Sequence, residues 1–305
     1  MHMMTQLYPV VEHFAAQGDH RLDRTYNWFM RILTLLAAFI ALIALPLTAP
    51  LEASPRVVER VAKTTLDNGA GRIVPVTLVA PRGRLRGVIA FSHGALSSPA
   101  KYVALTSRWA AAGYFVVAPL HGDSTEWTGA RPTLAEQLPW RLADMRLVKE
   151  QLGELARRAG VRLGRASLHA AGHSFGSLVA ILWDDPAIVS VIAISPPGPL
   201  PGLPMPPTTK SLLVVTGTRD ASPMIAPKWQ DHLTAYNQAI GPALAYVGTD
   251  ADHYFGGIYG RPELPGPKAE SAFADLVALS QAFLRSPQRA ARLRMRAGTL
   301  ESRGF

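Results

Sequence analysis

Short apolar segments alternate with segments of helical periodicity along most of this chain, and no other feature limits its possible folds so strongly. The apolar runs lie at residues 87–91, 114–119, 166–172, 188–195, 212–217 and 243–248. Strands that are apolar throughout are typical of a parallel sheet with helices on both faces. Two further runs, 57–66 and 73–81, are joined by the turn sequence DNGAGR and predict a hairpin. The sequence therefore predicts a mostly parallel, doubly wound α/β sheet with an antiparallel hairpin at its start.

Composition sets the size of the core and divides the chain into three parts. A chain of 305 residues that is 48% hydrophobic and 17% charged can bury one sizeable core. We expect an N-terminal extension at 1–53, an α/β domain at 54–285 and a basic C-terminal tail at 286–305. Six arginines in the final segment RSPQRAARLRMRAGTLESRGF supply much of the net charge of +9. We expect this tail to be solvated and frayed, and we predict no nucleic-acid partner.

A charge-free apolar segment, ILTLLAAFIALIALPL at 32–47, follows Arg31 near the N-terminus. Its length suits the apolar region of a signal peptide, or a short membrane anchor, better than a helix with a polar face. We therefore predict export to the periplasm or out of the cell, with cleavage after Ala53 and a translation start at Met30. Membrane association through an uncleaved anchor is the alternative.

The segment ASLHAAGHSFGSLVAIL, residues 166–182, places one serine between two glycines where a strand is expected to run into a helix. A serine in such a sharp turn is exposed at the carboxyl edge of the sheet, and residues 172 and 176 must be small to leave room for the turn. Free N–H groups at the start of the helix also point toward any negative charge that forms near the serine. Ser174 is therefore the candidate nucleophile.

Two further residues complete a catalytic arrangement with this serine. A serine hydroxyl needs a base to take its proton, and the base needs a third group to orient it. Asp220 follows the strand LLVVTG and His253 follows the strand ALAYVG, so both belong to the carboxyl edge of the sheet. We predict that Ser174 is the nucleophile, His253 the general base and Asp220 the orienting acid.

Other acidic residues and histidines fit these roles less well. Asp184 and Asp185 lie at the far end of the helix that follows the serine. Asp250 and Asp252 lie too close in sequence to the candidate histidine to reach behind its ring. We interpret three other histidines as packed or surface residues: His169, His173 and His232.

An acyl-transfer site also needs two N–H donors for the oxyanion. The first candidate is the backbone N–H of Phe175, directly after the serine. The segment FSHGA, residues 91–95, ends a strand at a glycine and can turn its backbone toward the same site, so the backbone N–H of Ala95 is the second candidate. We expect His93 to shape this loop rather than to act as a base.

The motifs GHSFG and FSHGA, the strand-end Asp220 and the segment DHYFGG resemble the α/β-hydrolase superfamily. Residues 57–284 are most similar to the branch with dienelactone hydrolases, bacterial relatives of platelet-activating-factor acetylhydrolase and chlorophyllase-like esterases. The segments DNGAGRIVPVTLVAP and WRLADMR also resemble that branch. The resemblance implies the α/β-hydrolase fold and serine-esterase chemistry without a metal or an organic cofactor. Dienelactone hydrolases use a cysteine nucleophile, and this chain has no cysteine, which leaves an ordinary serine esterase.

Little in the sequence identifies the substrate. The segment 195–209 is too short and too rich in proline to build a helical cap, so we predict an open site without a large cap domain. Trp127 and Trp140 are candidates for a substrate-binding wall, and packing within their own loop is an equal alternative. Short acyl esters, aryl esters, lipid esters and polyester chains stay open as small-molecule or polymeric substrates.

Other functional classes have weaker support. A serine peptidase or amidase would use the same triad, but the sequence lacks the extra domain or the acidic pair that such enzymes usually carry. A non-catalytic binding relative is expected to lose a triad member, and all three are present. Neither GxxxxGK[ST] nor HExxH occurs, which disfavours nucleotide-dependent and metal-dependent hydrolysis.

Overall fold

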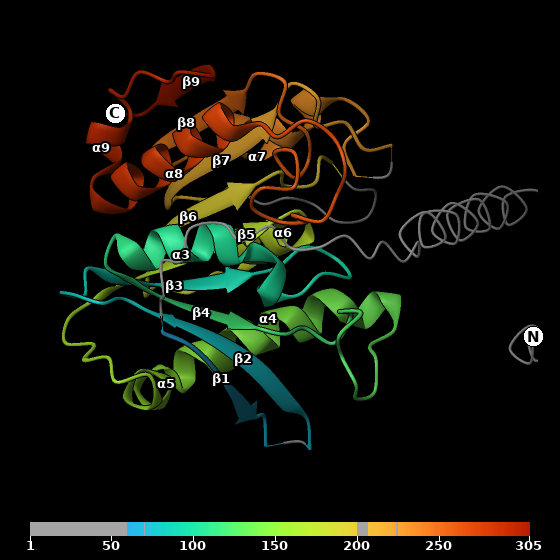
Figure 1. Ribbon diagram of the computed structural model, residues 1–305, viewed down its shortest axis with the longest axis vertical. Coiled ribbons are helices and arrows are strands. Elements are labelled where there is room, and N and C mark those ends of the chain that lie inside the picture. Colours follow the sequence, from blue (N-terminus) through green and yellow to red (C-terminus); the bar gives the residue numbers. More distant parts are fainter. Residues whose placement is uncertain (1–59, 70, 200–206, 224) are drawn as a thin grey trace, which may run out of the picture. The chain divides into compact units, whose positions relative to one another are not determined.

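The computed structural model describes residues 60–69, 71–199, 207–223 and 225–305. Within these residues, nine strands form one sheet in the order β1-β2-β4-β3-β5-β6-β7-β8-β9 (Figure 1). The strands are β1 (Arg60–Asp67), β2 (Ile73–Ala80), β3 (Gly87–Ser92), β4 (Tyr114–Pro119), β5 (Ser167–His173), β6 (Ile188–Ile194), β7 (Ser211–Gly217), β8 (Ala243–Gly248) and β9 (Gly298–Arg303). The predictions for 1–53, including the apolar segment 32–47, lie outside the described residues.

Strands β3 to β8 run parallel to one another, and β1 and β2 form an antiparallel hairpin at one end of the sheet. Strand β2 also pairs antiparallel with β4, which joins the hairpin to the parallel part. The mostly parallel sheet with an N-terminal hairpin is therefore confirmed. No large cap domain is present in the described part of the chain.

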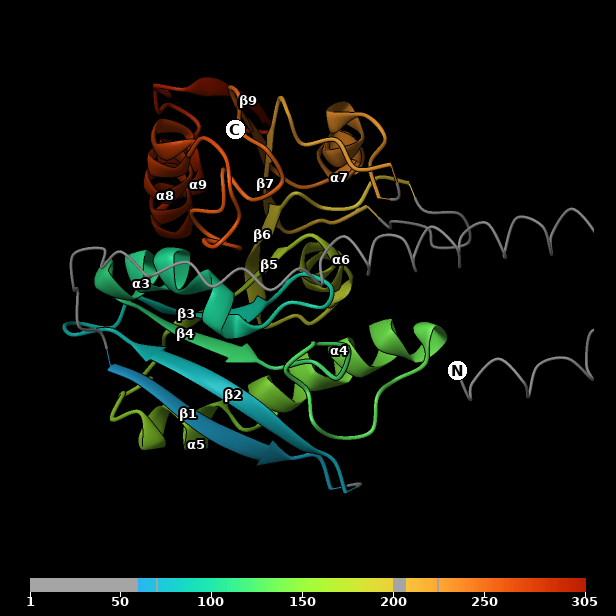
Figure 2. The ribbon, with the colours of Figure 1, turned by 45° about the vertical axis from the view of Figure 1, so that its right-hand side comes forward.

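Helices cover both faces of this sheet (Figure 2). They are η1 (Pro99–Tyr102), α3 (Val103–Ala111), α4 (Leu134–Glu150), α5 (Leu152–Arg158), α6 (Phe175–Leu182), η2 (Trp229–Leu233), α7 (Thr234–Gln238), α8 (Glu270–Arg285) and α9 (Pro287–Ala290). Neighbouring residues of one strand serve opposite faces, as in β3, where Val88 packs with α4 and α5 while Ile89 packs with α3 and α8. Two apolar cores thus sandwich the sheet, which explains why its central strands are mostly apolar. None of the helices in the described residues has the length and apolar character needed to span a bilayer.

The C-terminal segment 286–305 is part of the fold, so the expectation of a frayed tail was wrong. Strand β9 pairs antiparallel with β8 along its whole length, and Leu300 packs against the core on the α8 side. The Arg303 guanidinium donates to the carbonyl of Ala239 at 2.7 Å and lies over the ring of Tyr236. One of the arginines that suggested a solvated tail therefore bonds to backbone carbonyls. The strand itself is held by its backbone hydrogen bonds to β8.

Candidate active site

The strand-to-helix turn at Ser174 has the geometry that the glycines predicted. Ser174 lies between β5 and α6 with φ 54° and ψ −123°, a conformation that side chains rarely adopt. A Cβ on Gly172 would lie 2.1 Å from the carbonyl oxygen of Gly176, and a Cβ on Gly176 would lie 2.0 Å from that of Ser92. Neither position can hold a larger residue without a shift of the backbone. The turn leaves Ser174 8% exposed at the carboxyl edge of the sheet.

Asp220 and His253 meet directly, from the loops after β7 and β8. The Nδ1–H of His253 donates to Oδ1 of Asp220 at 2.8 Å. The hydroxyls of Ser195 and Thr216 donate to the other oxygen, Oδ2, at 2.6 and 2.9 Å. Burial alone would raise the pKa of Asp220, but the positive charge and hydrogen bonds of the two neighbouring histidines hold this pKa well below its usual range. Asp220 is thus an ionised, fully bonded acceptor that holds the ring of His253.

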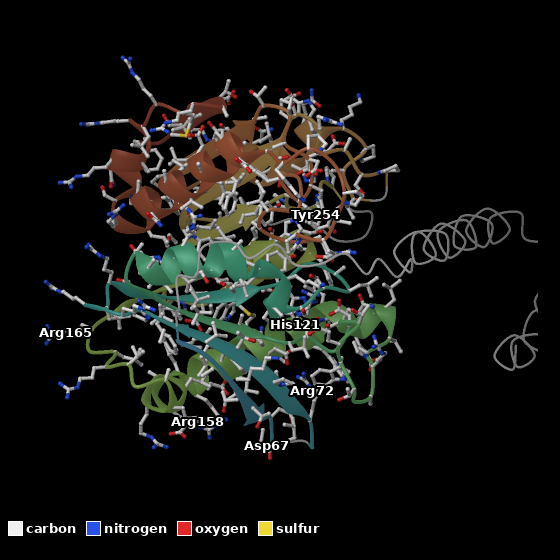
Figure 3. All side chains as sticks on the ribbon, in the orientation of Figure 1. Asp67, Arg72, His121, Arg158, Arg165 and Tyr254 are labelled. Carbon is white, nitrogen blue, oxygen red and sulfur yellow. The ribbon has the colours of Figure 1, made fainter. Side chains whose placement is uncertain are left out.

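The histidine loop lies against the turn that carries the serine. The rings of His173 and His253 are 4.7 Å apart between centroids, and the Nε2–H of His173 donates to the backbone oxygen of His253 at 3.0 Å. The hydroxyl of Tyr259 donates to the same oxygen at 2.5 Å. Tyr254, the residue after His253, lies on the side of the sheet to which the parallel strands point, opposite Arg165 (Figure 3). The three predicted triad residues therefore come from elements that meet at one edge of the sheet.

A hydrogen-bond chain joins this turn to the loop of the predicted oxyanion donor. Burial, followed by the charge of His253, holds the pKa of His173 well below its usual range. Its Nδ1 therefore accepts a hydrogen bond from the hydroxyl of Tyr102 at 2.6 Å. The Tyr102 oxygen accepts the backbone N–H of Gly94 at 3.1 Å. His173 was interpreted from sequence as a packed residue, and the structure gives it this linking position.

The sequence did not indicate the position of His232, which bonds to Asp220 beside His253. Its Nε2 is 2.9 Å from Oδ1 of Asp220, and its Nδ1 is 2.5 Å from the carbonyl oxygen of Pro196. Both neighbours only accept hydrogen bonds, so both ring nitrogens carry protons and the ring is an imidazolium. Burial lowers the pKa of His232, but the hydrogen bonds and charge of Asp220 outweigh burial and raise it.

Three groups at this site have the residue types of a metal site. One ligand atom from each of Asp220, His232 and His253 lies within 4.8 Å of the other two. A protonated imidazolium has no lone pair for a metal, so His232 in this state serves as a hydrogen-bond donor instead. His232 and His253 therefore each donate an N–H to the Asp220 carboxylate.

The two predicted oxyanion donors are free to bind a substrate oxygen. In the part of the chain that the structure describes, the backbone N–H groups of Ala95 and Phe175 have no acceptor. The neighbouring N–H of Leu96 is taken up by Asp123 at 3.3 Å. A Cβ on Gly94 would lie 3.5 Å from the Cβ of Ser174, so this loop lies against the candidate nucleophile. Two unpaired N–H groups on these segments are what the predicted oxyanion hole requires, and the role itself stays a prediction.

The two tryptophans proposed for substrate binding both have protein partners, one in the same loop and one in the turn before β2. Trp127 is only 7% exposed, and its indole N–H donates to the carbonyl of Ala130 at 2.8 Å. Trp140 lies under the guanidinium of Arg72, 4.9 Å from its ring centroid. These partners favour the packing alternative, and the substrate-binding role of the two rings stays a prediction.

A second Ser–His–Asp array lies beneath the site. The Ser92 hydroxyl is 2.9 Å from Nε2 of His121, and Nδ1 of His121 is 2.8 Å from Oδ2 of Asp144. All three residues are fully buried, and Arg72 forms an ion pair with Asp144. An ester carbonyl cannot approach a serine without exposed surface, so this array serves the packing of β3 against α4. Ser174, which is strained and keeps 8% of its surface exposed, stays the candidate nucleophile.

No family model and no curated protein matches this chain. Solved structures do: an esterase from Pyrobaculum calidifontis has a TM-score of 0.56 at 16% sequence identity, over 75% of this chain and 85% of that one. A ferulic acid esterase from Streptomyces cinnamoneus has a TM-score of 0.54 at 18% identity, over 78% and 91%. A butyrate-bound esterase from Thermogutta terrifontis has a TM-score of 0.55 at 14% identity, over 77% and 96%. At these identities the likeness concerns the fold, and with the strand order it shows that this chain has the α/β-hydrolase fold.

Proposed function

We propose that this protein is a serine hydrolase that cleaves carboxylic esters through an acyl-enzyme intermediate. The observation that carries the proposal is the Asp220–His253 pair against a serine held at φ 54° in a strand-to-helix turn. Because Nδ1 of His253 donates to Asp220, its Nε2 is left with the lone pair that a general base needs. Three neighbours named as esterases have the same fold, which supports this reaction class.

In the first half-reaction, Nε2 of His253 takes the proton of the Ser174 hydroxyl while Oγ attacks the ester carbonyl. The negative charge that forms on the carbonyl oxygen is stabilised by the backbone N–H groups of Ala95 and Phe175. His253 then returns the proton to the leaving alcohol as the C–O bond breaks. In the second half-reaction, water attacks the acyl group by the same route, which releases the acid and restores the serine.

The substrate is proposed at the level of the ester bond. The absence of cysteine argues against a dienelactone hydrolase, and the chlorophyllase-like or acetylhydrolase-like branch is the proposed affiliation. The absence of a large cap in the described residues supports an open site for soluble or extended esters. Cleavage of amides by a peptidase, and of lipid or polyester substrates, are the alternative outcomes of the experiment below.

The test is hydrolysis of p-nitrophenyl esters of graded acyl length, measured beside an aminoacyl anilide. We expect ester turnover that depends on acyl length, little anilide cleavage, and labelling of Ser174 by a fluorophosphonate. Ser174→Ala and His253→Ala should each abolish most turnover, and the double variant should lose little more than either alone, because the triad acts as a unit. Full ester turnover by folded Ser174→Ala would overturn the proposal.

The cellular location is a separate proposal and rests on the sequence alone. We propose that residues 32–47 direct export and that the mature chain begins near residue 54, with an uncleaved anchor as the alternative. Mass spectrometry of the protein from the cell envelope and the medium distinguishes the two. A full-length cytosolic chain would contradict both.

A further inference from the structure

We propose that Arg141 is a positioning residue that orients both N–H donors of the oxyanion hole. The inference rests on the proposed function, because it assigns a residue that the triad and its two donors do not include. Arg141 comes from the middle of α4, and its side chain is only 1% exposed. It cannot touch a substrate, so any effect on the reaction must pass through the residues that it holds.

The guanidinium binds the backbone of the oxyanion loop at two successive carbonyls. Its Nη1 donates to the carbonyl oxygen of His93 at 2.6 Å, and its Nη2 donates to that of Gly94 at 3.1 Å. The His93 ring supports the same arrangement. Its Nε2 accepts the backbone N–H of His121 at 3.0 Å, which leaves Nδ1–H to donate to the Gly94 oxygen at 2.8 Å.

The carbonyl of Gly94 and the N–H of Ala95 belong to one peptide group, and this links the guanidinium to the donor. The peptide is planar and trans, so its C=O and N–H point in opposite directions. Arg141 and His93 hold the oxygen toward the protein interior, and the N–H of Ala95 must then face the other way. Ala95 is exposed, while Gly94 is buried and Leu96 is half-buried. The orientation of this donor is thus set from the buried side of the loop.

The same guanidinium contacts the residue that carries the second donor. Its central carbon lies 4.7 Å from the ring centroid of Phe175, a cation–π distance. Phe175 opens α6, and its backbone N–H is the other candidate donor. One buried cation therefore contacts the two separate chain segments whose N–H groups must converge on one oxygen.

Asp123 holds the guanidinium in this position and balances its charge. Nε and Nη2 of Arg141 donate to the two carboxylate oxygens of Asp123 at 2.8 and 2.7 Å, a paired arrangement that fixes the plane of the group. Oδ2 of Asp123 also accepts the N–H of Leu96, the residue after the exposed donor. Burial raises the pKa of Asp123, but Arg141 outweighs burial and holds it far below its usual value. Because the pair is neutral as a whole, its effect on the oxyanion is orientation rather than attraction.

A second buried pair on α4 offers a matched control. Asp144 lies three residues after Arg141 on α4 and pairs with Arg72 of the hairpin end. This pair is also buried, at 14% and 0% side-chain exposure, but its guanidinium contacts Trp140 and not the oxyanion loop. Loss of either pair removes one buried ion pair and its packing, and loss of the second also changes the partner of His121 Nδ1. Only loss of the first releases the Gly94–Ala95 peptide.

The experiment compares two charge-neutral double variants, Asp123→Asn/Arg141→Met and Arg72→Met/Asp144→Asn. Each is measured for thermal unfolding, kcat and KM on a p-nitrophenyl ester, and inhibition by a trifluoromethyl ketone that forms a hemiketal oxyanion on the nucleophile. We expect the first double variant to lose about 10- to 100-fold in kcat, somewhat less than the full loss of a donor, with KM within about threefold. Its affinity for the ketone should fall in proportion to kcat/KM. The control should keep kcat and ketone affinity within about threefold of wild type.

A single variant, Arg141→Lys, keeps the charge beside Asp123 and serves if the double variant does not fold. An ammonium lacks the planar fork that reaches two carbonyls and a carboxylate together. We therefore expect a smaller loss of kcat than in the double variant, again with little change in KM. A folded Arg141 variant with kcat and ketone affinity near wild type would overturn the inference, and so would an equal loss in the control. Absence of Ser174-dependent turnover in the wild type would instead refute the proposed function.

Discussion

Replacement of His232 by glutamine removes a buried positive charge beside the proposed triad without removing a hydrogen-bonding side chain. The ring centroids of His232 and His253 are 6.0 Å apart, with Asp220 bonded to both. Two unit charges at this distance repel by about 2.8 kcal/mol at an effective dielectric constant of 20, which corresponds to about two pH units. The His253 side chain is 18% exposed, and solvent there reduces the effect to about one unit.

The sign of the effect follows from the repulsion. A proton on His253 in the wild type would lie close to the cation at His232, at a ring-centroid distance of 6.0 Å, and the substitution removes this repulsion. In His232→Gln this repulsion is absent, and the acidic limb of the kcat/KM profile should move to higher pH by about one unit. The ester panel above, run from acidic to neutral pH on folded variants, measures the shift.

A buried histidine away from the triad supplies the control for this profile. His169 on β5 bonds to Ser190, and burial lowers its pKa to about 4, so it is uncharged over the range measured. His169→Gln removes a buried ring without a change of charge and should leave the acidic limb in place. The electrostatic argument is refuted if the acidic limb of His232→Gln keeps the wild-type position, or if that of His169→Gln moves by the same amount.

Three further predictions follow from the same contacts. Ser92→Ala should keep fluorophosphonate labelling and most ester turnover, and complete loss of labelling in a folded protein would make the buried array catalytic. Gly176→Ala should fold poorly or not at all, because its Cβ would lie 2.0 Å from a carbonyl oxygen; circular dichroism and thermal unfolding measure this. Because the pKa of His232 is raised in the folded protein, protonation of His232 stabilises the fold. This contribution to the unfolding free energy is complete below the ordinary pKa of 6.5 and is lost as pH rises through the folded pKa. The difference in unfolding free energy between wild type and His232→Gln should therefore shrink from acidic to alkaline pH, and a difference that grows would contradict it.

Local sequence patterns predicted the features that depend on neighbouring residues. The apolar runs predicted the parallel sheet, because a strand covered on both faces has no polar side. The spacing of Gly172, Ser174 and Gly176 predicted the turn, since the close approach of its backbone excludes any Cβ at the flanking positions. The positions of Asp220 and His253 followed from strand ends, which meet at one edge in a parallel sheet.

Contacts between distant elements could not be predicted in this way. The hydrogen bonds from Arg141 to the loop after β3 depend on the strand order β4-β3-β5 and on where α4 packs. No local sequence pattern encodes either. His232 looks like any histidine on a short helix until the fold brings it behind the triad acid. Strand β9 was hidden by its arginines, because its pairing with β8 comes from the backbone and not from the composition of its side chains.

The position of β9 gives the last few residues of the chain an importance beyond their length. Every residue of β8 is buried, and β9 is the outermost strand beside it, with exposed charged residues such as Glu301 and Arg303 along its length. Charged outer strands discourage other chains from adding to a sheet. Proteolytic clipping before residue 298 would leave the apolar β8 as the new border, with its N–H and C=O groups unpaired. Such a clipped molecule should self-associate and precipitate.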